Sequence, residues 1–193
     1  MADGDGTEEG RTVDPLVAHQ RAQDAFAGVL ANLSPDQFGA PTPCSEWTIR
    51  DLIEHVIAGN EHVGQWAGSH EEPPARPDDI VAAHRAAAVA AQEVFARPGG
   101  MAAVFKLRFG EVPGEVFIGM RTTDVLTHAW DLAAATNQST DLDPELATEQ
   151  LAAARAIVAP QFRGPGKPFG DEQPCPPGRT AADQLAAFLG RKV

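Results

Sequence analysis

Apolar residues recur every three or four positions in several separate stretches of this chain, and this period constrains its fold more than any other feature. One stretch has its apolar residues at Ile49, Leu52, Ile53, Val56 and Ile57, which a helix places along one side. Alanine is abundant and tyrosine is absent, a composition that favours helix over sheet. The sequence therefore predicts an all-α protein whose helices each bury one face.

Capping residues and helix breakers divide the chain into five main helices. Asp14-Pro15 and Asp143-Pro144 each place an N-cap residue before a proline that suits the first helical turn, and Thr48 stands three residues before an aspartate, the spacing of a capping box. The expected helices span about 15–33, 49–64, 79–96, 113–136 and 144–159, followed by a short one at 181–189. An up-and-down four-helix bundle with short extra C-terminal helices is the natural arrangement for these elements.

Three stretches lack the helical period. Residues 104–109 alternate loosely between apolar and polar side chains, which suits a short extended piece, although we expect strand content near zero. Residues 160–179 hold six prolines and four glycines and should be irregular. Residues 1–11 are rich in glycine and acidic residues, so we expect a disordered tail there and a single domain over 12–193.

Charge and hydropathy argue against two classes of partner. The chain has 27 acidic and 15 basic residues and no basic run of the kind that binds nucleic-acid phosphates. No apolar run approaches the roughly 20 residues that span a membrane, and no N-terminal stretch resembles a signal peptide. The two cysteines, Cys44 and Cys175, are too few and too distant to suggest a disulfide framework. We therefore expect a cytoplasmic protein that binds neither nucleic acid nor membrane.

Three residues on two expected helices have the chemistry of a metal site. Asp124 and His128 stand four positions apart, so a helix stacks them on one face, one turn from each other. His55 lies beside the apolar stripe of an earlier helix. Two histidines and one carboxylate leave coordination positions open for water or substrate. The alternative is an ordinary helical contact between Asp124 and His128, with His55 as a structural histidine.

Four more side chains are candidates for the surroundings of this site. His62, seven residues after His55, shares roughly its helix face and is a candidate pocket residue. Asp131 could accept a hydrogen bond from a ligand imidazole and fix its tautomer, or serve as a surface charge. Arg121 is expected to pair at the surface with Asp51 or another helix carboxylate, with an anionic substrate as the alternative partner. Trp47 is expected to be a core aromatic near the ligands.

The remaining histidines and the first cysteine are assigned structural roles. His19 and His84 fall in polar stretches of their helices, and His70 lies among glutamates in a loop, so all three are expected at the periphery. Cys44 precedes the second helix, where a thiol pKa can be lowered by the helix N-terminus. A small buried residue is nevertheless the favoured interpretation of Cys44.

Two segments resemble a known family. PTPCSEWTIRDLIEH at 41–55 and MRTTDVLTHAWDLA at 120–133 are similar to the signature segments of actinobacterial proteins that share the metal-binding domain of mycothiol-dependent maleylpyruvate isomerase, in the DinB-like superfamily. The tail, with its segments around 163–170 and 181–190, resembles the usual ending of these proteins. The resemblance covers roughly residues 13–190 and is specific to the superfamily rather than to one reaction.

The resemblance implies a four-helix bundle that holds a divalent metal, commonly zinc or nickel, at one end. The family's two histidine ligands and its carboxylate ligand fall on His55, His128 and Asp124. The isomerase has glutamate as that carboxylate, so Asp124 is one methylene shorter. The resemblance also implies chemistry that depends on a small thiol, mycothiol, acting on an electrophilic substrate as an isomerase or transferase.

Two functional hypotheses remain open from the sequence. The isomerase has a further C-terminal domain that contributes to its active site, and a chain of 193 residues leaves no room for it, so isomerisation of maleylpyruvate itself is not expected. The first hypothesis is therefore a related metal- and thiol-dependent enzyme. The second is a non-catalytic small-molecule-binding or stress-response module that keeps the bundle and the metal. Either could form a homodimer.

Overall fold

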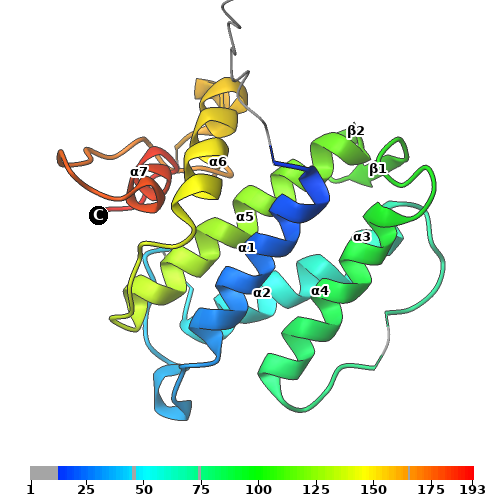
Figure 1. Ribbon diagram of the computed structural model, residues 1–193, viewed down its shortest axis with the longest axis horizontal. Coiled ribbons are helices and arrows are strands. Elements are labelled where there is room, and N and C mark those ends of the chain that lie inside the picture. Colours follow the sequence, from blue (N-terminus) through cyan, green and yellow to red (C-terminus); the bar gives the residue numbers. More distant parts are fainter. Residues whose placement is uncertain (1–12, 45–46, 74, 165) are drawn as a thin grey trace, which may run out of the picture.

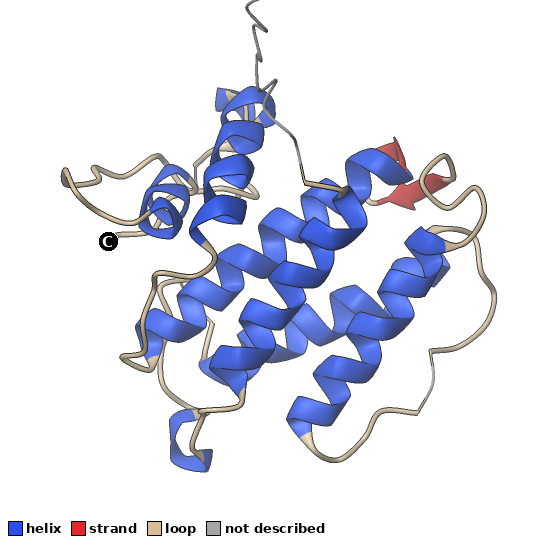
Figure 2. Ribbon diagram, viewed as in Figure 1, coloured by secondary structure: helices blue, strands red, loops and turns tan. Residues whose placement is uncertain are grey.

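Helices dominate the protein, as Figures 1 and 2 show. The computed structural model describes residues 13–44, 47–73, 75–164 and 166–193, so the expected tail at 1–11 lies outside the described residues. Four of its helices are α1 (Pro15–Leu30), α2 (Ile49–Glu61), α4 (Ile80–Ala96) and α5 (Gly114–Ala135). The remaining helical elements are α3 (Val63–Trp66), α6 (Pro144–Ile157), α7 (Ala181–Phe188) and the 3-10 turns η1 (Pro35–Gln37) and η2 (Pro160–Phe162). The prediction of an all-α fold is confirmed.

The helices α1, α2, α4 and α5 form a four-helix bundle. α1 packs against α5 and α4, and α2 packs against the same two helices, so α1 and α2 stand at opposite corners. Fully buried side chains from all four fill the space between them, among them Phe26, Ile53, Ala87 and Leu126. Burial of this apolar surface is the main stabilising contribution to the bundle.

Side-chain caps begin the helices where the sequence predicts them. The Asp14 carboxylate accepts hydrogen bonds from the first backbone N–H groups of α1, and Thr48 and Asp51 cap each other's backbone N–H groups at the start of α2. The same reciprocal box, between Thr180 and Asp183, starts α7. Each cap satisfies N–H groups that the helix itself leaves unpaired.

A β-hairpin connects α4 to α5. Its strands β1 (Val104–Leu107) and β2 (Gly110–Pro113) pair antiparallel, so the expected short extended piece is one half of a two-stranded sheet. The hairpin lies at one end of the bundle, in green at the top right of Figure 1 and in red in Figure 2. Phe105 of β1 is fully buried against Phe95 of α4 and Phe117 of α5, which form a second, smaller core.

The C-terminal third packs on the opposite side of α5 from α4. α6 and α7 contact each other and α5, and they lie at the left of Figure 1, away from α3 and α4. Trp130 in the C-terminal half of α5 donates from Nε1 to Asp183 Oδ1 at 2.8 Å, so a buried hydrogen bond holds α7 against the bundle. No helix in the described part of the chain is both long enough and apolar enough to cross a membrane.

Candidate metal centre

His55 of α2 meets Asp124 and His128 of α5 where the two helices pack. One ligand atom from each residue lies within 4.8 Å of the other two. His55 Nε2 is 3.5 Å from Asp124 Oδ2, and His128 Nε2 is 3.4 Å from Asp124 Oδ1. A tetrahedral ion with ligand bonds of about 2.1 Å separates its ligand atoms by about 3.4 Å. Each imidazole therefore lies at about this separation from one oxygen of Asp124, His55 from Oδ2 and His128 from Oδ1.

The polar atoms of this cluster fit a cation better than they fit one another. His55 Nε2 is buried and has no hydrogen-bond partner among the described residues, and its 3.5 Å separation from Asp124 is long for a hydrogen bond. Burial alone would raise the pKa of Asp124, but His128 and Arg121 beside it hold that pKa well below its ordinary value. An ionised carboxylate and an unpaired imidazole nitrogen are the donor atoms that zinc and nickel accept.

Asp131 orients His128 through the imidazole nitrogen Nδ1, whereas Nε2 faces Asp124. The fully buried Asp131 carboxylate accepts a hydrogen bond from His128 Nδ1 at 3.0 Å, and Arg191 donates to both of its oxygens at 3.1 and 2.9 Å. Burial would raise the pKa of Asp131, but His128 and Arg191 lower it, so the group stays ionised. A proton fixed on Nδ1 leaves Nε2 of His128 to face Asp124 and a metal. Asp131 thus lies where the sequence analysis proposed a tautomer-fixing acceptor.

Arg121 pairs with a helix carboxylate, Asp124, but it is buried, so the expected surface location of the pair is wrong. The whole residue is 6% exposed. Its Nη1 donates to Asp124 Oδ2 at 2.8 Å, and its Nη2 donates to Asn60 Oδ1 at 3.0 Å. The packing of α5 against α2 encloses the guanidinium, and an acceptor from each helix compensates for the lost solvation.

Trp47 and His62 lie in different surroundings. Trp47, at the foot of α2, is partly buried and packs its ring 4.6 Å from the His55 ring and 5.5 Å from the His128 ring. The Trp47 ring therefore packs beside the candidate ligands and is not fully buried in the core. His62 is exposed at the end of α2, where Nδ1 contacts Ala58 O at 2.6 Å and the ring stacks on Trp66. The structure does not bring His62 to the three candidate ligands.

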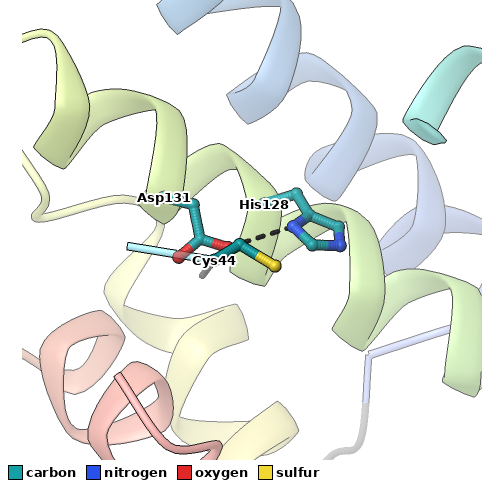
Figure 3. A group of neighbouring side chains, drawn as sticks. All are labelled: Cys44, His128 and Asp131. Atoms are coloured by element: carbon teal, nitrogen blue, oxygen red, sulfur yellow. Dashed lines mark hydrogen bonds and ion pairs between the residues drawn. The ribbon is translucent and has the colours of Figure 1, made fainter. Parts of the chain in front are cut away.

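Cys44 lies on the other side of His128. Its Sγ forms a second compact group with His128 and Asp131, which Figure 3 shows with the His128–Asp131 hydrogen bond as a dashed line. Burial raises the pKa of the Cys44 thiol to about 11, with Asp131 and Asp124 nearby adding to the effect against the opposing charge of Arg191. The helix N-terminus therefore does not activate this thiol, and the interpretation as a small, partly buried residue fits its position.

A buried hydrogen-bond network was missed by the sequence analysis. His19 and His84 are 0% and 1% exposed, so their expected peripheral position is wrong. Gln23 joins them, since its Nε2 donates to His19 Nε2 and its Oε1 accepts from His84 Nε2. Gln23 also exchanges two hydrogen bonds with Asn60, which in turn accepts from Arg121. The network therefore runs from the middle of the bundle to Asp124.

A local signal for this network was present in the sequence. His19 and Gln23 stand four residues apart, and Phe26 follows three residues later, so all three share the inward face of α1. Polar residues at such positions must find buried partners, because an unpaired polar group in a core costs free energy. Which residues those partners are depends on α2 and α4, which the spacing along α1 does not identify.

Comparison with known proteins relates the chain to two Mycobacterium tuberculosis proteins, MT0763 of strain CDC 1551 and Rv0738 of strain H37Rv. Each is 76% identical over 181 residues, which cover 94% of this chain and 100% of the relative. Among solved structures, the mycothiol-dependent maleylpyruvate isomerase aligns with a TM-score of 0.56 and 21% identity, and a histidine-to-alanine mutant of it with 0.57 and 19%. Both alignments cover 72% of this chain and 67% of the other, and they establish the shared DinB-like fold.

The family match includes every candidate metal ligand. Residues 19–133, more than half of the chain, match the family described as the mycothiol maleylpyruvate isomerase N-terminal domain. His55, Asp124, His128 and Asp131 all fall inside this range, whereas α6 and α7 follow it. The chain therefore belongs to the family of the mycothiol maleylpyruvate isomerase N-terminal domain.

Proposed function

We propose that His55, Asp124 and His128 bind a divalent metal ion, zinc or nickel, and that the protein is a metal- and thiol-dependent isomerase or transferase that uses mycothiol. The observation that carries the proposal is the convergence of the three side chains from two helices, with a buried and unpartnered His55 Nε2 among the described residues. Membership of the mycothiol maleylpyruvate isomerase family supports the choice of thiol.

The residues around the site would orient its metal ligands and leave one side open to a small molecule. When bound, a divalent cation supplies a Lewis acid that lowers the pKa of a thiol and favours the nucleophilic thiolate. Asp131 holds the imidazole of His128, and Arg121 holds the carboxylate of Asp124. The side chains of His55 and Asp124 are 38% and 32% exposed, so the site faces solvent on their side.

A second candidate function is a binding module that keeps the metal without catalysing a reaction. The positions of His62 and Asp131, two titratable residues near the candidate ligands in the sequence, favour it. His62 points to Trp66, and Asp131 is fully buried with both oxygens occupied by His128 and Arg191. Neither is free to exchange a proton with a molecule at the solvent-facing side of the site.

Elemental analysis of the protein purified without a histidine tag tests the first part of the proposal, because a tag itself carries nickel. We expect about one zinc or nickel ion per chain, and purified protein that neither contains nor takes up either metal would contradict the proposed site. Turnover of electrophilic substrates, with and without mycothiol, then tests the second part. Product formation that requires both metal and thiol supports an enzyme, whereas metal binding without turnover supports the binding module.

A further inference from the structure

We propose that Arg121, seated against Gly59, is a positioning residue that holds the carboxylate of Asp124 in the orientation in which it binds the metal. This inference rests on the proposed metal site. Arg121 and Asp124 are three residues apart on α5, and Nη1 donates to Oδ2 at 2.8 Å. With Oδ2 held in this way, Oδ1 faces His128 Nε2 at 3.4 Å, and Oδ2 itself lies 3.5 Å from His55 Nε2. Contacts within the protein thus fix the orientation of the Asp124 carboxylate before a metal ion binds.

A glycine on the facing helix makes room for the guanidinium. A Cβ atom at Gly59 would lie 2.7, 2.8 and 2.9 Å from Nη1, Nη2 and Cζ of Arg121. These separations are shorter than carbon tolerates, and the atoms involved belong to the movable end of a side chain. A methyl group at this position would therefore displace the guanidinium rather than the helix.

Gly59 has no local reason to be glycine. It lies inside the last turn of α2, which ends at Glu61, and its backbone is not in the left-handed region that requires glycine. Inside a helix, glycine is less favourable than alanine. The close approach of Arg121 is thus the feature of the structure that excludes a side chain at this position.

Asn60 fixes the other side of the guanidinium. Its Oδ1 accepts from Arg121 Nη2, and both Oδ1 and Nδ2 are also hydrogen-bonded to the buried amide of Gln23. The amides of Asn60 and Gln23 each donate one hydrogen bond to the other and accept one in return. This reciprocal pair fixes the orientation of the Asn60 amide. The guanidinium of Arg121 therefore donates to Asn60 of α2 and to Asp124 of α5 at the same time.

The same contacts argue against a direct role for Arg121 in substrate binding. Its side chain is 7% exposed, and both terminal nitrogens are occupied by protein oxygens. An anionic substrate would have to replace Asp124 or Asn60 to reach it. Arg121 acts on the site through Asp124.

Metal affinity of Gly59→Ala and Arg121→Met, measured by competition with a chromogenic chelator for Zn²⁺, tests the inference. We expect Gly59→Ala to weaken binding about tenfold or more, as changes in residues that orient a metal ligand do. Its thermal unfolding temperature, measured in parallel, shows that the variant folds, since the helical preference of alanine opposes the cost of the hydrogen bonds that the displaced guanidinium loses. Gly28→Ala is the matched control, since a Cβ at this helical glycine of α1 meets no atom within 4 Å.

The double variant Gly59→Ala/Arg121→Met identifies the route of the effect. If Gly59→Ala acts by moving the guanidinium, it should cause no further loss of affinity once the guanidinium is gone. Absorption of bound Co²⁺ gives a second readout, because a change in how Asp124 binds the ion changes the visible spectrum. Gly59→Ala carries the test by itself if Arg121→Met does not fold.

The outcomes separate this inference from the proposed function. A wild-type protein that binds no divalent metal overturns both. A wild-type protein that binds Zn²⁺ while Gly59→Ala binds it as tightly as Gly28→Ala overturns the role of Arg121 and leaves the metal site intact. An equal loss from Gly59→Ala with and without Arg121 also overturns it.

Discussion

Arg191 and Asp131 form a two-point ion pair, with Nε 3.1 Å from Oδ1 and Nη2 2.9 Å from Oδ2. Asp131 lies on α5 beside the candidate ligand His128, whereas Arg191 follows α7, beyond the residues that match the family. The C-terminal third of the chain thereby reaches the carboxylate that orients His128. The candidate metal centre depends on this part of the protein as well as on the bundle.

Replacement of Arg191 by methionine should destabilise the protein. Asp131 is 0% exposed, and removal of one partner of a buried ion pair costs about 3–5 kcal/mol because the remaining charge lacks compensation. Urea unfolding followed by circular dichroism measures this loss. The double variant Asp131→Asn/Arg191→Met should recover part of it, since the isolated charge is then absent. A loss below about 1 kcal/mol in Arg191→Met would show that the pair contributes little.

Variants of the two α5 ligands should separate metal binding from folding. His128→Ala should lose the metal but keep the helical circular dichroism spectrum, because the apolar core holds the bundle. Asp124→Asn keeps the shape of the side chain but removes its charge, so metal affinity should drop strongly. Asp124→Glu should be milder, because glutamate retains the charge. Full metal retention in His128→Ala would refute this ligand, and global unfolding of Asp124→Asn would indicate a structural Asp–His pair instead.

Cys44 should not be needed for metal binding. Cys44, His128 and Asp131 form the alternative group of candidate ligands, but burial raises the pKa of the thiol to about 11 and Asp131 is already paired with Arg191. We therefore expect Cys44→Ala to retain the metal and His55→Ala to lose it, with Cys175→Ala as a control. Elemental analysis of the three proteins distinguishes the sites, and the reverse pattern would place the ion beside Cys44.

Acid should destabilise the metal-free protein before its carboxylates are protonated. Burial lowers the pKa of both His19 and His84 from 6.5 to about 4, so the unfolded chain binds protons at these residues first. Their contribution to stability is complete above pH 6.5 and is lost as the pH falls toward 4, on the order of 2 kcal/mol each by pH 5. The raised pKa of His128 acts in the opposite direction, above pH 6.5.

Urea unfolding in the presence of a chelator, at several pH values between 7 and 4.5, checks this acid dependence. His84→Gln should reduce the slope of stability against pH by about half, whatever it does to stability at neutral pH, because one of two titrating groups is absent. His62→Gln is the control, since His62 is exposed. A slope that does not change in His84→Gln would contradict the assignment.

The helices could be predicted from the sequence because their determinants are local. α4 begins at Ile80, one residue after the predicted start at 79, because Asp79 caps it, and α6 begins at the predicted Pro144. The predicted start of α5 at 113 was one residue early because Pro113 ends strand β2. The hairpin could be predicted only as an extended piece, since its second strand is defined by pairing with the first and by the burial of Phe105.

The sequence by itself determined which residues could share a helix face, and therefore that Asp124 and His128 lie one turn apart. The helical repeat sets that spacing wherever the helix is placed. The tertiary structure alone decided that His55 meets them, that Arg121 is buried against Gly59 and that Arg191 pairs with Asp131. These partners are separated by about 60 residues or more, and only the packing of whole helices, driven by their apolar faces, brings them together.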